Sequence, residues 1–315
     1  MLLDKYIYTF GYDHTESELC KLESKYIFNK EDENKALLSN LKIDPACSAF
    51  IKRRFDVILF SEDYTALINE IKKKSLSIEG FKVEYLVLDG DGDTTKYDER
   101  LAKLRDIGYS IEGTPDYYSP TITYALCFYQ RVWYFGILIK NNFSWYKHKQ
   151  KPCSSSNSIK INIAKALVNI AAKANKGNTL IDACCGVGTV MLEACFAGYD
   201  IEGCDINWKQ CRDARVNISH FNYTAKVYRS DIKDISKKYD AAIVDLPYNL
   251  LSRATDRDIL HIIMSAKEIT DRLVVVSIAD ITSLIKNAGF RISDYCSVSK
   301  IGRKNFARNI WVCEK

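Results

Sequence analysis

The sequence of 315 residues lacks a long apolar run, a zinc-binding pattern and an internal repeat. No stretch approaches the roughly 20 consecutive apolar residues that a membrane-spanning helix requires. Near the first residue, the charged Asp4 and Lys5 stand where a signal peptide would have a continuous apolar segment. We therefore expect a cytoplasmic protein with no membrane partner.

The eleven cysteines form no CxxC pair and no Cys/His set with the spacing of a zinc site. An odd number of cysteines cannot be closed entirely into disulfides, so we expect free thiols in a reducing compartment and no bound metal. The net charge of +5 is mildly basic. Such a charge permits a polyanionic partner without identifying one.

The length leaves room for two domains. Residues 1–150 are typical of an α+β region, with strands expected at 6–11, 55–60 and 81–88, helices at 16–25, 64–74 and 97–107, and a hairpin of 122–129 with 132–139. A polar stretch rich in serine lies between Asn141 and Ser158. Such a composition is typical of a linker, and we place the domain boundary after residue 150.

Residues 151–315 alternate between helical and strand patterns. Strands are expected at 179–183, 200–204, 225–228, 241–244 and 273–277, and near 290–298 and 306–313. This alternation predicts an α/β domain with a doubly wound, Rossmann-like and mostly parallel sheet of seven strands. Ligands bind such sheets at the carboxyl ends of the strands.

A glycine-rich turn follows the first of these strands. Glycine tolerates positive φ and has no side chain, so the backbone of such a turn can approach a ligand closely. The missing third glycine and the acid at the strand end suit a nucleoside that bears an amino acid better than a pyrophosphate, although a GxG pattern alone is equally compatible with a tight turn or a dinucleotide site. The predicted ligand residues of this turn are Asp182, Cys184, Gly186, Gly188 and Thr189.

The next two strands also end in polar residues. Asp205 lies nineteen residues after Gly186, where its carboxylate can accept hydrogen bonds from both ribose hydroxyls. The alternative is that Asp205 merely caps the following helix. The predicted cofactor contacts at these two tips are Asp205 with Ile206, and Ser230 with Asp231 and Ile232, although Asp231 fits a solvated turn equally well.

The motif Asp245-Leu246-Pro247-Tyr248 follows the fourth strand. An amine conjugated to a base is a poor nucleophile, so its lone pair must be aimed at the methyl donor. The Asp245 carboxylate and the Leu246 carbonyl can accept its two N–H bonds, and Tyr248 can stack on a base that has left its helical stack. Alone, the motif would more often be a strand-ending turn with a packed tyrosine. In series with the three preceding tips, it predicts a methyltransferase that uses S-adenosylmethionine and acts on an amino group.

The sequence resembles the THUMP-associated tRNA guanine 2-amino methyltransferases, which modify guanosine at the tenth tRNA position. The likeness covers the C-terminal domain, including Lys151-Pro152 and the helix at 164–171. It implies a class I methyltransferase fold, Asp245 within the cofactor site, a THUMP-like RNA-binding region over residues 1–150, and RNA, chiefly tRNA, as partner. The family usually has proline at Leu246 and glycine at Asn249, which leaves the target nucleotide open. A small activating protein subunit also stays open.

Three basic stretches suit phosphate contact and base stacking, although each is more often a solvated face. Two further functions stay open. The first is amino-methylation of DNA adenine or protein glutamine, and the second is a non-catalytic RNA-binding scaffold. The predicted RNA-binding residues are Lys52, Arg53 and Arg54, then Lys147 and Lys149, and finally Arg303 and Lys304.

Overall fold

The structure is a computed structural model that describes residues 4–88, 93–156, 158–246, 255–299 and 307–315. It divides into two compact units. The first comprises Met1–Gly11, Asp32–Ala46 and Ile51–Asn142, and the second comprises Tyr12–Glu31, Cys47–Phe50 and Phe143–Lys315. The boundary that we expected after residue 150 therefore lies inside the second unit, which also takes two segments from the first half of the chain.

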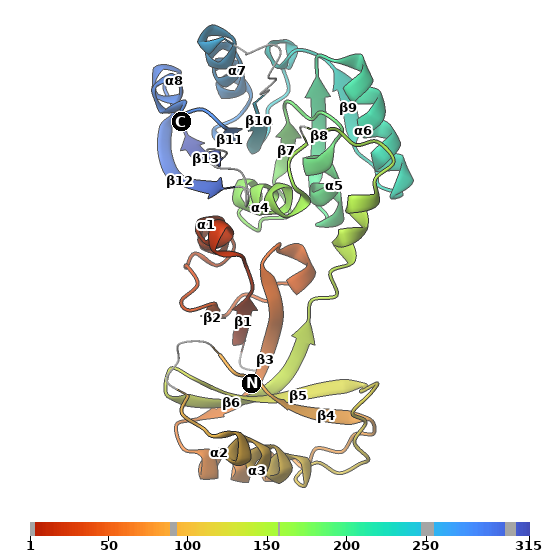
Figure 1. Ribbon diagram of the computed structural model, residues 1–315, viewed down its shortest axis with the longest axis vertical. Helices are drawn as coiled ribbons and strands as arrows, with labels where there is room; N and C mark the ends of the chain where they lie inside the picture. Colours follow the sequence, from red (N-terminus) through yellow and green to blue (C-terminus); the bar gives the residue numbers. More distant parts are fainter. Residues whose placement is uncertain (1–3, 89–92, 157, 247–254, 300–306) are drawn as a thin grey trace. The chain divides into compact units, whose positions relative to one another are not determined.

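The first unit is built on a six-stranded sheet with the order β2-β1-β3-β6-β5-β4. Its helices are α2 (Tyr64–Lys73) and α3 (Tyr97–Gly108). They cover one face of the sheet (Figure 1) and bury Leu67, Ile71 and Ile107 against it. The strands are β1 (Tyr6–Phe10), β2 (Ala36–Ser39), β3 (Ile51–Ser61), β4 (Phe81–Tyr85), β5 (Ile122–Tyr129) and β6 (Val132–Lys140).

The expected hairpin of β5 and β6 is present, with antiparallel pairing from Tyr124 opposite Ile137 to Tyr129 opposite Val132. Its two turn residues, Gln130 and Arg131, have φ values of 49° and 65°. Two residues with positive φ are characteristic of a tight turn whose twist matches that of its strands. The α+β character predicted for this part of the chain is thus confirmed.

The second unit contains a seven-stranded sheet with the order β12-β13-β11-β10-β7-β8-β9. Neighbouring strands from β11 to β9 are parallel, and β13 runs antiparallel to β11 and β12. The prediction of a seven-stranded sheet is confirmed, and its parallel part comprises the five strands from β11 to β9. The strands are β7 (Thr179–Asp182), β8 (Asp200–Asp205), β9 (Lys226–Arg229), β10 (Ala241–Asp245), β11 (Arg272–Ser277), β12 (Arg291–Ser299) and β13 (Ala307–Glu314).

Helices join and cover these strands. One hydrophobic core includes residues of α7 and α8 and of the sheet, among them Ile263, Ile285 and Val275. Another helix, α4, is buried almost all round, as expected for a helix that is apolar on every face. The helices of this sheet are α4 (Ile161–Ala172), α5 (Thr189–Phe196), α6 (Trp208–His220), α7 (Asp256–Ile269) and α8 (Thr282–Asn287), with the short 3-10 turn η4 (Ile232–Asp234) after β9.

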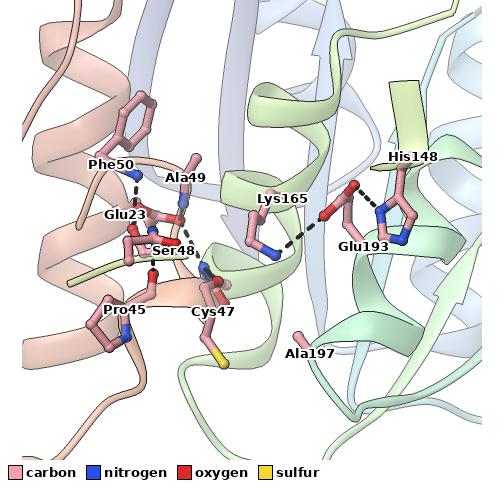
Figure 2. A network of polar contacts seen from close by, with 12 residues as sticks. Glu23, Pro45, Cys47, Ser48, Ala49, Phe50, His148, Lys165, Glu193 and Ala197 are labelled. Atoms are coloured by element: carbon pink, nitrogen blue, oxygen red, sulfur yellow. Dashed lines mark hydrogen bonds and ion pairs between the residues drawn. The ribbon is translucent and has the colours of Figure 1, made fainter. Parts of the chain in front are cut away.

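The helix α1 (Ser17–Phe28) belongs to the second unit although it lies near the start of the chain. It packs against α4 and β12. Its Glu23 is fully buried and accepts hydrogen bonds from Ser48 Oγ at 2.6 Å and Asn169 Nδ2 at 2.7 Å (Figure 2). Because a buried carboxylate must be hydrogen-bonded, these contacts fix α1 and residues 47–50 to α4.

The polar stretch that we expected to be a linker includes a 3-10 helix, η3 (Ser144–Gln150), docked on the second unit. His148 is fully buried, with Nδ1 2.7 Å from Glu193 Oε1 on α5 and Nε2 3.0 Å from the Tyr223 hydroxyl. Lys165 Nζ on α4 lies 3.2 Å from Glu193 Oε2 (Figure 2). These contacts, with buried Trp145, explain why the second unit starts before residue 151.

Candidate functional site

Three acidic strand tips lie together at one edge of the seven-stranded sheet. Asp182 ends β7, Asp205 ends β8 and Asp245 ends β10, and these strands are parallel neighbours in the order β10-β7-β8. Burial, together with the negative charges of Asp245 and Asp205, raises the pKa of Asp182 well above its usual range. The edge is therefore electronegative, which favours a ligand that carries a positive charge.

The glycine turn after β7 has the backbone conformation that its sequence requires. Gly186 and Gly188 have φ values of 51° and 79°, in the left-handed region that favours glycine. A Cβ atom at Gly188 would lie 3.2 Å from Ala214 Cβ on α6. The turn therefore packs closely on α6, and α5 begins immediately after it at Thr189.

Asp205 joins the glycine turn to the tip of β8. Its Oδ2 accepts a hydrogen bond from the Gly186 backbone N–H at 3.0 Å, and its Oδ1 accepts one from Asn207 N–H at 2.8 Å. The N-cap of α6 is Asn207, whose side chain accepts from Lys209 N–H. The alternative interpretation of Asp205 as the cap of this helix is therefore wrong.

Two buried polar atoms beside the turn lack a hydrogen-bond partner within the described part of the chain. They are Thr189 Oγ1 and Gln210 Oε1, and Gln210 Oε1 lies 4.0 Å from the position that a Cβ of Gly186 would take. Buried polar atoms are nearly always paired. Ile206, beside Asp205, is a large apolar residue that is 72% exposed. Such a surface fits a ligand with both polar and apolar faces.

The residues that follow β9 only partly match the prediction. Asp231 accepts a hydrogen bond from Lys233 N–H and caps η4, and Ser230 Oγ donates to the Asp231 carbonyl at 3.0 Å. Ser230 N–H donates to the Asp205 carbonyl at 3.2 Å, which ties this tip to that of β8. Ile232, which we expected at the cofactor, is buried in the hydrophobic core with Val244.

The described residues include half of the predicted catalytic motif. Asp245 lies opposite Val276 on β11, and Leu246 N–H donates to the Val276 carbonyl at 3.0 Å. The Leu246 side chain is buried, so it points away from solvent while its backbone continues the edge of the sheet. Pro247 and Tyr248 lie outside the described residues, and so does Asn249.

The predicted RNA-binding residues have different surroundings. Arg54 forms an ion pair with Asp56 at 2.6 Å and donates a hydrogen bond to the Ile43 carbonyl. These contacts indicate that Arg54 has a structural role and does not serve RNA binding. Its neighbour Arg53 is exposed and Lys52 is half-buried.

The second predicted RNA-binding stretch, which lies in η3, agrees better with the prediction. Lys147 and Lys149 are exposed, and Lys149 Nζ lies 4.1 Å from the centre of the Tyr146 ring. Arg303 and Lys304 lie outside the described residues.

Sequence reasoning missed the thiols that support the site. Cys204 Sγ donates to the Ala183 carbonyl at 3.5 Å, and Cys211 Sγ donates to the Asp205 carbonyl at 3.3 Å. Burial and nearby carboxylates raise the pKa of Cys184 and of Cys185 well above the usual range, so both thiols stay protonated and unreactive. All eleven cysteines are free. Among the residues with described positions, no group of three or more His, Cys, Asp or Glu side chains could hold a metal.

No helix within the described ranges has the length and apolar character needed to cross a lipid bilayer.

Part of the chain is similar to known methyltransferases. Residues 148–271 match the family model of the RMKL-like methyltransferase domain. A tRNA (guanine(10)-N2)-dimethyltransferase of Methanothermobacter thermautotrophicus is 29% identical over 118 residues, which are 36% of this chain and 35% of the relative. The corresponding enzyme of Methanocaldococcus jannaschii is 30% identical over 118 residues, covering 34% of this chain and 33% of the relative. The chain thus matches about a third of the length of these curated relatives.

Among solved structures, TrmN from Thermus thermophilus is similar with 13% identity, a TM-score of 0.48 and coverage of 99% of both chains. The matched residues 148–271 lie within the second unit, which also contains the acidic tips and the glycine turn. The curated relatives confirm the resemblance to the tRNA guanine methyltransferases.

Proposed function

We propose that the protein is an S-adenosylmethionine-dependent methyltransferase that methylates the exocyclic 2-amino group of a guanosine in tRNA. The observation that carries this proposal is the meeting of Asp182, Asp205 and Asp245 with the Gly186 turn at the ends of three adjacent parallel strands. The matches to tRNA guanine methyltransferases support the choice of substrate.

The residues present fit the cofactor. S-adenosylmethionine would supply an electrophilic methyl group on a sulfonium centre. Its positive charges suit the negative potential of the Asp245 and Asp205 carboxylates, which also raises the pKa of Asp182, and its ribose hydroxyls suit Asp205 as acceptor. The exposed side chain of Ile206 offers an apolar surface to the adenine, and Thr189 offers a buried hydroxyl that has no hydrogen-bond partner among the described residues.

Asp245 and the Leu246 carbonyl would hold the guanine amine. Two acceptors at the end of β10 can take its two N–H bonds and so aim the nitrogen lone pair. The Asp245 carboxylate can then receive the proton that the nitrogen loses once it has gained a methyl group. Tyr248 as a stacking partner of the flipped base stays a prediction.

We assign the first unit, together with the exposed Arg53, to RNA binding as a THUMP-like region. We also propose that the protein acts on tRNA in the cytoplasm. A requirement for an activating subunit is a separate question that the assay of the isolated chain answers directly.

The test is methyl transfer from labelled S-adenosylmethionine to an unmodified tRNA transcript, followed by identification of the product nucleoside. We expect N2-methylated guanosine from the wild-type chain, and loss of transfer with cofactor binding retained in Asp245→Ala. Methylation of DNA adenine or of protein glutamine by the same protein, without tRNA methylation, would contradict the proposal. A non-catalytic scaffold would fail to bind S-adenosylmethionine in calorimetry.

A further inference from the structure

The excess positive charge of the chain is concentrated in one short part of the second unit. Between Trp208 and Lys238 the sequence has eight Lys and Arg residues and three Asp residues, which is a net charge of +5. The whole chain also has a net charge of +5, so its other residues carry equal numbers of basic and acidic side chains. Charge of one sign gathered in this way produces a local potential that the overall charge conceals.

These residues form the open edge of the seven-stranded sheet. The strand β9 is the last in the sheet order, and α6 lies beside it (Figure 1). The helix contributes Lys209, Arg212 and Arg215, and the strand contributes Lys226 and Arg229, all of them exposed. Further exposed lysines follow in and after η4, so we name this surface, formed by α6, β9 and η4, the basic edge.

Part of this charge is not neutralised within the protein. Lys226 Nζ and Lys237 Nζ lie 3.8 and 2.9 Å from Glu202 Oε1, so these two are paired. Lys209 and Arg229 have no ion-pair partner among the residues that the structure describes. Their cationic groups therefore face solvent and can bind an external anion.

The same edge has a groove and an exposed aromatic ring. The groove has a volume of about 470 Å³ and is lined in part by Arg215, Asn222 and Thr224. Trp208 is 57% exposed, and the Arg212 guanidinium carbon lies 5.6 Å from the centre of its ring. Exposed rings beside cations are suited to single-stranded nucleic acid, which offers bases for stacking and phosphates for ion pairing.

We propose that the basic edge binds the phosphate backbone of the RNA substrate. This inference rests on the proposed function for the identity of the polyanion, whereas the charge and the groove are independent of it. Three strand spacings separate β9 from β10, which is about 14 Å. An RNA strand seated on the basic edge therefore reaches Asp245 within a few nucleotides of its contacts with Lys209 and Arg229.

A competing explanation is that lysines on an edge strand prevent pairing with other proteins. The double variant Lys209→Gln/Arg229→Gln distinguishes the two, because neither side chain forms an ion pair with a residue whose position the structure describes. Its matched control is Lys21→Gln/Lys286→Gln, which removes two exposed charges from α1 and α8 of the same unit. The probe is an unmodified tRNA transcript, with its affinity measured over a range of salt concentrations.

We expect the edge variant to bind tRNA roughly 10- to 100-fold more weakly, and the slope of log affinity against log salt to fall by about 2, because two phosphate contacts are lost. The control should change less than about twofold. Equal binding by the two variants, or no tRNA binding by the wild type, overturns the inference. Duplex DNA bound as tightly as tRNA, with the same salt slope, also overturns the assignment to RNA.

If the proposed function is wrong and the basic edge nevertheless binds tRNA, the experiments give a different set of results. A wild-type chain that transfers no methyl group, yet loses tRNA affinity in the edge variant alone, supports the basic edge and contradicts the proposed reaction. Calorimetry with S-adenosylmethionine should give the same affinity for both double variants, which shows that the neighbouring cofactor site is intact.

Discussion

The Asp205 carboxylate accepts a hydrogen bond from the Gly186 backbone N–H at 3.0 Å. This contact spans nineteen positions of sequence and joins the tip of β8 to the turn after β7. A single side chain thus holds the turn in place and, in the proposed function, also binds the ribose. Removal of this carboxylate should therefore disturb both the tip of β8 and the turn after β7.

Asp205→Ala should weaken S-adenosylmethionine binding by roughly 10- to 100-fold, because hydrogen bonds to a charged group each contribute about 1.5–3 kcal/mol. Titration calorimetry measures this directly. The control is Asp200→Ala, at the exposed first residue of the same strand, and it should leave the affinity unchanged. Equal losses in both variants would mean that β8 as a whole, and not its carboxyl tip, determines binding.

Gly188→Ala should destabilise the second unit for two reasons. An alanine in the left-handed region costs about 1–2 kcal/mol, and its Cβ would also lie 3.2 Å from Ala214 Cβ. Gly198→Ala is the matched control, since Gly198 has a similar φ of 75° and nothing within 4 Å of the new Cβ. Urea unfolding should show a larger loss for Gly188→Ala, and equal losses would eliminate crowding as a cause.

The unfolding free energy should depend on pH through Glu202. Burial alone would raise its pKa, but hydrogen bonds from Tyr239, Lys237 and Tyr228 lower the pKa to about 2. Because the folded pKa is lower than the unfolded value, the stabilisation is present above about pH 4.5 and is lost as the pH falls toward 2.

Glu202→Gln should remove this dependence, so that the free energy of unfolding falls by about 2 kcal/mol less between about pH 4.5 and pH 2. Chemical unfolding of both proteins at a series of pH values gives the comparison. Curves that stay parallel between pH 4.5 and 2 would show that other acids dominate.

Asn169→Ala should destabilise the second unit by about 1–3 kcal/mol, because it leaves the buried Glu23 carboxylate without one of its donors. Burial already raises the pKa of Glu23, so lost hydrogen bonds leave its charged form still less favourable. Asn287→Ala, at the exposed end of α8, should change stability by no more than about 0.5 kcal/mol. A similar result for both variants would refute the role of this contact.

Local sequence patterns were sufficient to predict the sheet of the second unit. Apolar strands that end in Asp182, Asp205 and Asp245 have short, recognisable boundaries, and parallel strands bring their ends to one edge. The glycine turn could also be predicted from the sequence, because glycine is the residue that most easily adopts the positive φ found at Gly186 and Gly188.

Long-range contacts escaped prediction. Nothing in the sequence around Glu23 indicates that it is buried against Asn169, 146 positions later. In the same way, His148 lies in a polar stretch that is typical of a linker, and only its contact with Glu193 on α5 fixes that stretch to the second unit. One local contact was missed as well: the basic run Lys52-Arg53-Arg54 indicated phosphate contact, but Arg54 forms an ion pair with Asp56, two positions later.

The position of α1 within the second unit affects how the nascent chain folds. The helix is synthesised early, whereas its neighbours on β12 follow more than 250 residues later. At about 5–20 residues per second, the last part of the surface that α1 packs against, on β12, is made roughly 10 to 60 s after the helix itself. During that interval α1 lacks part of its final packing surface, and a chaperone that shields its apolar face would raise the yield of folded protein.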